Sequence, residues 1–208
     1  MSLTLLTALQ FGDAGFPSGG FAQSWGLETA LRDGRLDRAS LPAWIEGEIA
    51  DRWAPFDRVA LAGAWSGAHS GRVGWAETVD AAYWSETHRL RSLEAGAALL
   101  VAARRMGLSP LPQAAHLPIA QAAVFRAAGL DLEVALAVSA HQAAQGLATA
   151  AVRLNLIGAV AVQAVLRDLR PALAQAATLP AADEHPASFA PISDIALLRP
   201  YPDRLFVT

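Results

Sequence analysis

The sequence predicts an all-α protein, a single-domain bundle of about seven to nine helices followed by a proline-rich C-terminal tail. Apolar residues recur at helical spacing along most of the chain, and no run alternates polar and apolar residues convincingly as a half-buried strand would. Glycines and prolines separate the periodic stretches. Residues 178–208 contain five prolines and differ in composition from the rest. We therefore expect a helical domain over 1–177 and a tail over 178–208.

The composition narrows the possible classes of protein. A chain of 208 residues can bury a substantial core, and 53% hydrophobic with 17% charged residues excludes a disordered protein. This apolar content should leave apolar surface to be covered, which favours an oligomer or a permanently bound partner. The net charge of −3 and the scattered arginines exclude a basic patch for nucleic acid. No apolar run reaches about 18 residues, and we read no signal peptide, so we expect a cytoplasmic protein that is not in a membrane.

Two residue types are missing from the sequence. It has no cysteine, which excludes disulfides, thiol nucleophiles and thiolate metal ligands. It has no lysine either, since all sixteen basic residues are arginine. A phosphate-binding loop with its lysine and a Schiff-base lysine are therefore excluded.

The first helical element is expected directly after a glycine pair. Pro17 disfavours helix before it, and Gly19 and Gly20 allow a tight entry. From Phe21 onward, aromatic and charged residues fall at helical spacing as far as Arg32. Gly34 is a plausible C-terminal stop. A glycine pair opening a helix could hold an anion, but no phosphate-binding pattern is complete, so we favour a packing role.

The same spacing predicts further helices over residues 41–53, 55–65, 75–106, 118–128 and 131–149, and one within 151–166. Ser40 is placed to cap the first of these, and Pro55 is expected to interrupt the chain between the first two. Residues 66–74 should form a break, and the long stretch is one helix or two joined near Leu93. The proline-rich residues 107–118 should form a loop, and Asp131 should cap the predicted helix that begins at that residue.

Three groups of polar residues are candidate sites. Asp80, Trp84 and His88 are one helical turn apart with Glu77 beside them, which suits either a metal site or a solvated face; we favour the face, because no second imidazole has the right spacing. We interpret His141 as a packed core residue. The run 183–185, Asp-Glu-His, is a polar linker or a weak metal site, and we favour the linker.

The segment after the first proline resembles the P-[ST]-G-G-F-A-x-S-x-G-L-E signature near the start of UreF urease accessory proteins. Gln23 and Trp25 stand where that family usually has His and commonly has Tyr. The matching residues are Pro17, Ser18, Gly19, Gly20, Phe21, Ala22, Ser24, Gly26, Leu27 and Glu28.

Weaker likenesses to the same family occur later in the chain. The family's R-L-x-x-x-G segment followed by Gln is matched by Arg153, Leu154, Gly158 and Gln163. Its D-I-A and R-L-F elements are matched by Asp194, Ile195 and Ala196 and by Arg204, Leu205 and Phe206. Arg153 is expected either to pair with a buried carboxylate or to lie at an interface.

The resemblance implies a non-enzymatic protein, without a cofactor, that dimerises. It implies binding to a UreD/UreH-type accessory protein and recruitment of the UreG-type GTPase, so that nickel reaches apo-urease. We expect the tail to bind the UreD/UreH-type partner, with Arg199 and Arg204 adding charge-assisted contacts. The alternative is a small α-helical enzyme or cofactor-binding protein that uses Glu28, His88 or His141 as acid or base.

Overall fold

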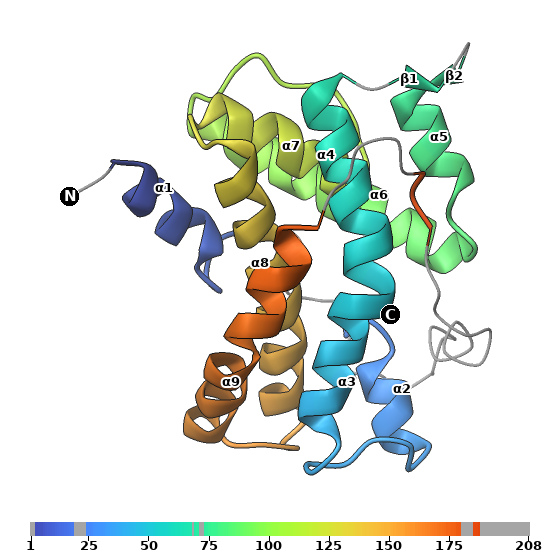
Figure 1. Cartoon of the computed structure of the whole chain (residues 1–208), viewed down its shortest axis with the longest axis vertical. Coiled ribbons are helices and arrows are strands. Elements are labelled where there is room, and N and C mark those ends of the chain that lie inside the picture. Colours follow the sequence, from blue (N-terminus) through green and yellow to red (C-terminus); the bar gives the residue numbers. More distant parts are fainter. Residues whose placement is uncertain (1–2, 19–23, 68, 71–72, 180–184, 188–208) are drawn as a thin grey trace.

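Helices make up nearly all of the regular structure, which confirms the all-α prediction (Figure 1). The computed structural model describes residues 3–18, 24–67, 69–70, 73–179 and 185–187. The elements in chain order are α1 (Leu3–Gly12), α2 (Leu27–Arg32), α3 (Leu41–Gly47), the π-helix η2 (Glu48–Asp57), α4 (Arg58–Ser66), the two-residue strands β1 (His69–Ser70) and β2 (Val73–Gly74), α5 (Trp75–Ala81), α6 (Glu86–Arg105), α7 (Leu117–Ala127), α8 (Leu132–Arg153) and α9 (Ala159–Ala177).

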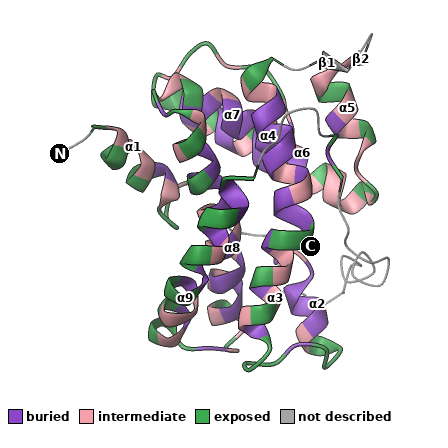
Figure 2. Ribbon diagram, in the orientation of Figure 1, coloured by how far each residue is buried: buried purple, intermediate pink, exposed green. Residues whose placement is uncertain are grey.

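Helix α8 lies at the centre of the bundle and packs against α1, α4, α7 and α9 (Figure 1). Its alanine-rich surface lets its neighbours approach closely. One core cluster joins α8 to α2, α3, η2 and α9 around Leu147 and Trp53. A second surrounds Phe11 and Phe125 and joins α1, α6, α7 and α8. Figure 2 shows the buried residues concentrated along these inner helix faces.

The prediction of a break at Pro55 is wrong. Helices α3, η2 and α4 follow one another from Leu41 to Ser66 without interruption, and Pro55 lies inside η2. Proline disrupts an α-helix because it lacks an N–H group and its ring meets the preceding turn. Here the backbone takes the wider π-helical form, in which Arg58 N–H donates to the carbonyl of Trp53, five residues earlier.

The stretch 75–106 forms two helices, but they meet at residues 82–85 and not near Leu93. The second helix, α6, begins there because the side chain of Ser85 accepts a hydrogen bond from His88 N–H and caps the helix. The predicted break at 66–74 contains Gly67, with φ 73°, and the short antiparallel pair β1–β2. These two-residue strands were not predicted.

Some predicted helix ends are found and others differ. Gly34 ends α2 with φ 68°, and its N–H donates to the carbonyl of Leu31. Asp131 caps α8 by accepting a hydrogen bond from Val134 N–H at 2.8 Å. Ser40 stands before α3, but its hydroxyl bonds Asp37 and caps no helical N–H. Helix α8 continues to Arg153, beyond the predicted end at 149, and α9 extends to Ala177, past residue 166.

The first part of the chain differs most from expectation. Helix α1 was not predicted, and α2 begins at Leu27 instead of directly after the glycine pair. Trp25, with φ 49°, and Gly26, with φ 84°, both have left-handed backbone angles that no regular helix contains. The chain therefore turns sharply where a helix was expected.

The beginning of the predicted tail contacts the bundle. Arg58 Nη1 donates to the carbonyl of Leu179 at 2.9 Å, and Ala187 N–H donates to the carbonyl of Pro55 at 3.0 Å. Pro186, which precedes Ala187, is buried. The division of the chain at residues 177 and 178 stays a prediction. In the part of the chain that the structure describes, no helix is both long and apolar enough to cross a membrane.

Candidate functional site

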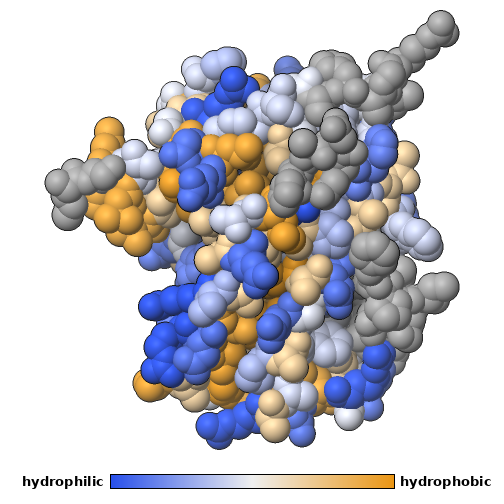
Figure 3. Space-filling view, in the orientation of Figure 1, coloured by the Kyte–Doolittle hydropathy of each residue, from blue (hydrophilic) through white to orange (hydrophobic). Residues whose placement is uncertain are grey.

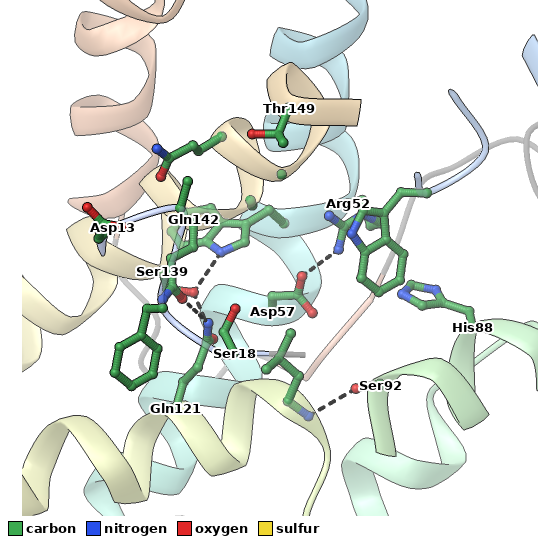
Figure 4. A pocket seen from close by; sticks show the side chains of 18 residues that line it. Asp13, Ser18, Arg52, Asp57, His88, Ser92, Gln121, Ser139, Gln142 and Thr149 are labelled. Atoms are coloured by element: carbon green, nitrogen blue, oxygen red, sulfur yellow. Dashed lines mark hydrogen bonds and ion pairs between the residues drawn. The ribbon is translucent and has the colours of Figure 1, made fainter. Parts of the chain in front are cut away.

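A pocket lined by both polar and apolar side chains lies where η2, α6, α7, α8 and the segment after α1 converge (Figure 4). Its volume of about 90 Å³ has room for several water molecules. Its walls combine one ion pair with many neutral hydroxyl and amide groups. The lining residues are Asp13, Ala14, Phe16, Ser18, Trp25, Arg52, Trp53, Asp57, His88, Ser92, Leu117, Gln121, Ser139, Gln142, Ala143, Gln145, Gly146 and Thr149.

The glycine-containing motif borders this pocket. Ser18 and Trp25, on either side of residues 19–23, both line it. Ser24 is fully buried, and its hydroxyl has no hydrogen-bond partner among the described residues. The motif residues Gly19, Gly20 and Phe21 lie outside the described residues, whereas Gly26 provides the left-handed turn before α2. Of the described residues in this segment, Ser18 and Trp25 thus line the pocket.

Arg52 is the only basic residue among those lining the pocket. Its Nε lies 2.8 Å from a Glu48 carboxylate oxygen, and its Nη1 lies 2.5 Å from Asp57 Oδ2. Burial alone would lower the pKa of Arg52, but the charges of Asp57 and Glu48 outweigh it, so the pKa is raised. For Asp57, burial raises the pKa and Arg52 opposes the rise. Arg52 also lies over the ring of Trp25, 4.9 Å from its centroid.

His88 faces the pocket from α6 beside this ion pair (Figure 4). Its ring makes edge contacts with Trp25 and Tyr83, at centroid distances of 5.0 and 5.1 Å. Burial, together with the positive charge of Arg52, lowers the pKa of His88 to about 3. His88 is therefore neutral near pH 7 and adds a hydrogen-bonding imidazole to the wall without a charge.

A second polar cluster contacts His88 through the ring of Tyr83. Tyr83 stacks on His116 at 4.7 Å, and its hydroxyl donates to Ser92 Oγ at 2.6 Å. His116 Nε2 lies 2.9 Å from Asp80 Oδ1, and Ser92 Oγ also accepts from Leu117 N–H. Burial raises the pKa of Tyr83, which stays protonated and keeps donating. These contacts fix α5, α6 and the start of α7 relative to one another.

A chain of neutral hydrogen bonds forms the opposite wall (Figure 4). Trp53 Nε1 donates to Ser139 Oγ at 3.1 Å, and that hydroxyl donates to Gln121 Oε1 at 2.9 Å. Gln121 Nε2 donates to Gln142 Oε1 at 2.8 Å, and Gln142 Nε2 donates to the carbonyl of Phe11 at 2.6 Å. The chain connects η2, α8, α7 and α1. Such a wall can fix helices or bind polar groups, but it offers no strong base.

The residues proposed as acid or base in an enzyme do not come together. Glu28 is buried on α2, bonds Arg32 at 3.0 Å, and is not among the lining residues. His141 is half-buried on α8, also outside the lining, and burial lowers its pKa. Of the three, His88 alone lines the pocket. The alternative of an enzyme that uses Glu28 or His141 therefore gains no support from this pocket.

The proposed face of Asp80, Trp84 and His88 does not exist, because the helix breaks between α5 and α6. Asp80 pairs with His116 and Arg89, Trp84 is 75% exposed, and His88 faces the pocket. The favoured interpretation of a solvated face is therefore wrong for His88. No group of three His, Cys, Asp or Glu residues placed to hold a metal ion occurs among the described residues.

Two further predictions concern residues distant from the pocket. Arg153 is exposed in the last turn of α8, and its pairing with a carboxylate or its role at an interface stays a prediction. Asp194, Arg199, Arg204, Leu205 and Phe206 lie outside the described residues, as do Asp183 and Glu184.

The sequence reasoning missed the residues that dominate the pocket, namely Arg52, Asp57, Gln121, Ser139 and Gln142. Arg52 and Asp57 are five positions apart, a spacing that separates side chains in an α-helix and aligns them in a π-turn. Pro55, which lies between them, was the sequence feature that could have indicated the π-helix. The amide chain joins residues up to 131 positions apart, as between Gln142 and Phe11, and no local pattern indicates such contacts.

Comparison with known proteins identifies relatives over most of the chain. The family model described as UreF matches residues 36–170. A protein named urease accessory protein UreF from Cereibacter sphaeroides is 34% identical over 182 residues, covering 85% of this chain and 83% of that protein. Proteins of that name are 32% identical in Roseobacter denitrificans, over 83% of this chain and 78% of the relative, and in Brucella anthropi, where the name is UreF 1, over 78% and 74%.

Proposed function

Since this chain belongs to the UreF family of urease accessory proteins, we propose that it is an assembly factor that bridges a UreD/UreH-type protein and the UreG-type GTPase during nickel delivery to apo-urease. It acts as a cytoplasmic homodimer. It uses no cofactor and catalyses no reaction of its own.

The observation that carries this proposal is the extent of the similarity. The Cereibacter relative is matched along more than four fifths of its own length, so the shared region includes almost the whole bundle and not one common motif. The relatives bear the name of accessory proteins. A scaffold of that kind needs defined surfaces more than a reactive centre.

The chemistry of the pocket supports a binding role. Its strongest ionic groups, Arg52 and Asp57, neutralise each other, and its amides and hydroxyls bond mainly to other helices. His88 has too low a pKa to act as a base at neutral pH. These groups hold the surrounding elements in one arrangement beside the motif.

We assign three regions to partner binding. The first is the motif from Pro17 to Glu28, beside the pocket. The second is Arg153, at the exposed end of α8. The third is the tail over 178–208, with the arginines and apolar side chains near its end.

Co-purification tests the proposal. The full chain with an affinity tag is co-expressed with a UreD/UreH-type protein and a UreG-type GTPase, and the retained proteins are identified. We expect all three to elute as one complex, and the pair without this chain to bind less of the GTPase. Failure of this chain to retain either partner would contradict the proposal.

A further inference from the structure

Helix α1 turns its leucines away from the protein. Leu3, Leu5, Leu6 and Leu9 are 78%, 52%, 46% and 60% exposed. The side that meets the bundle carries the half-buried Thr4, Thr7 and Ala8 and the buried Phe11. At 100° per residue, Leu5, Leu6 and Leu9 form one stripe opposite Ala8 and Phe11. A surface helix normally has the reverse arrangement.

The helix is held as a projecting arm. It extends from the bundle at its N-terminal end, and its outer surface is apolar (Figures 1 and 3). Its last turn is anchored, because Phe11 packs against Phe16 and Phe125 at 4.8 and 5.2 Å between ring centroids. Gln142 also donates to the carbonyl of Phe11. The contacts at this end fix the direction of α1 and the side on which the leucines lie.

The charge pattern distinguishes between kinds of partner. Helix α1 contains no charged side chain, and the first arginine of the sequence is Arg32. A helix that binds an anionic lipid surface needs a basic face, which α1 lacks. An uncharged face can meet a second copy of the same chain without repulsion between like charges, as the self-complementary interface of a two-fold dimer requires.

The exposed area agrees with an exchange of arms between two copies. If a fully exposed leucine side chain offers about 120 Å² of apolar surface, the four leucines together expose on the order of 300 Å². Two arms that packed only on each other would bury roughly 600 Å², too little for a stable dimer. Two arms that each pack on the body of the other copy would bury about 1,200 Å², where stable interfaces begin.

We propose that the leucine face of α1, formed by Leu3, Leu5, Leu6 and Leu9, packs against the body of a second copy of this chain in a two-fold exchange of arms. This inference deepens the proposed function, on whose homodimer it rests. It assigns the dimer contact to the arm.

The test is the molar mass of the full chain in solution, measured by light scattering after size exclusion. We expect the mass of two chains for the parent protein and of one chain for Leu5→Glu/Leu9→Glu, with unchanged helix content by circular dichroism. The control is Val160→Glu on α9, which puts the same charge on an apolar residue that is 87% exposed, and it should stay dimeric. The milder Leu5→Ala/Leu9→Ala should raise the dimer dissociation constant at least tenfold and avoids any effect of charge on folding.

Three results would overturn the inference: a monomeric parent protein, dimeric leucine variants, or a monomeric Val160→Glu. If the parent is monomeric and the leucine variants lose a urease accessory partner, α1 belongs to that partner. If the parent binds lipid vesicles through α1, it is a membrane contact. Loss of the proposed function appears separately, as failure of the parent chain to co-purify with its partners.

Discussion

Arg52 and Asp57 form an ion pair across a turn of π-helix, with 2.5 Å between Nη1 and Oδ2. The wider turn has two consequences. It accommodates Pro55 inside a helical segment that runs from Leu41 to Ser66, and it brings a cation and an anion five residues apart into one pocket wall. The same ten residues thus determine both the course of the backbone and the charge of the site.

Replacing Arg52 with alanine should lower the free energy of unfolding by about 3 to 5 kcal/mol, because the carboxylate of Asp57 would remain buried without its partner. Urea unfolding followed by circular dichroism measures the loss. The control is Arg167→Ala, whose pair with Asp168 is about two-thirds exposed and should contribute less than about 1 kcal/mol. Equal losses in the two variants would show that the Arg52 pair is not a buried one.

The protein should lose stability as the pH falls below about 6.5, the ordinary pKa of histidine. The pKa of His88 is lowered to about 3 in the folded chain. Between these two pKa values the unfolded chain binds a proton at His88 that the folded chain does not bind, so acid favours the unfolded state. Replacing His88 with phenylalanine, which keeps the aromatic packing, should flatten the dependence between pH 4.5 and 6.5, measured by urea unfolding at several pH values. The control is His185→Gln at an exposed position. An unchanged slope in His88→Phe would contradict the account of its burial.

Two helical glycines should respond in opposite ways to alanine. A Cβ at Gly96 on α6 would lie 2.1 Å from the carbonyl oxygen of Ala115, so the helices must separate, and we expect a loss of about 1 to 3 kcal/mol. A Cβ at Gly146 on α8 meets nothing within 4 Å, and alanine there should add up to about 1 kcal/mol. Thermal unfolding of the two variants and of the parent protein measures these changes in stability. A stabilised Gly96→Ala would mean that α6 and α7 are not in close contact.

The sequence allows the helical class, the proline-rich loop before α7 and the caps at Gly34 and Asp131 to be predicted, because each depends on local backbone chemistry. It does not allow the π-helical course at Pro55 to be predicted, since proline inside a helical segment normally indicates a break. The pocket is assembled from tertiary contacts. His88 was singled out from the sequence, but its aromatic neighbours and its low pKa come from residues brought together by folding.

Truncation after Ala187 should leave the fold intact and abolish binding to a UreD/UreH-type partner. The shortened chain keeps the hydrogen bond from Ala187 to Pro55 and the contact between Arg58 and Leu179. It lacks the tail residues Arg199 and Arg204. Circular dichroism and co-elution of the two forms side by side provide the measurement. Retained co-elution would remove the tail from the interface, and collapse of the fold would make it a structural part of the bundle.

The central claim is that this chain assists the maturation of urease, and activation of apo-urease tests it most directly. Apo-urease, nickel, GTP, a UreD/UreH-type protein and a UreG-type GTPase are combined with and without this chain, and urea hydrolysis is followed over time. The account predicts that activity appears at a rate that depends on the chain, and that the form truncated after Ala187 gives no increase. Equal activation in the presence and absence of the full chain would contradict it.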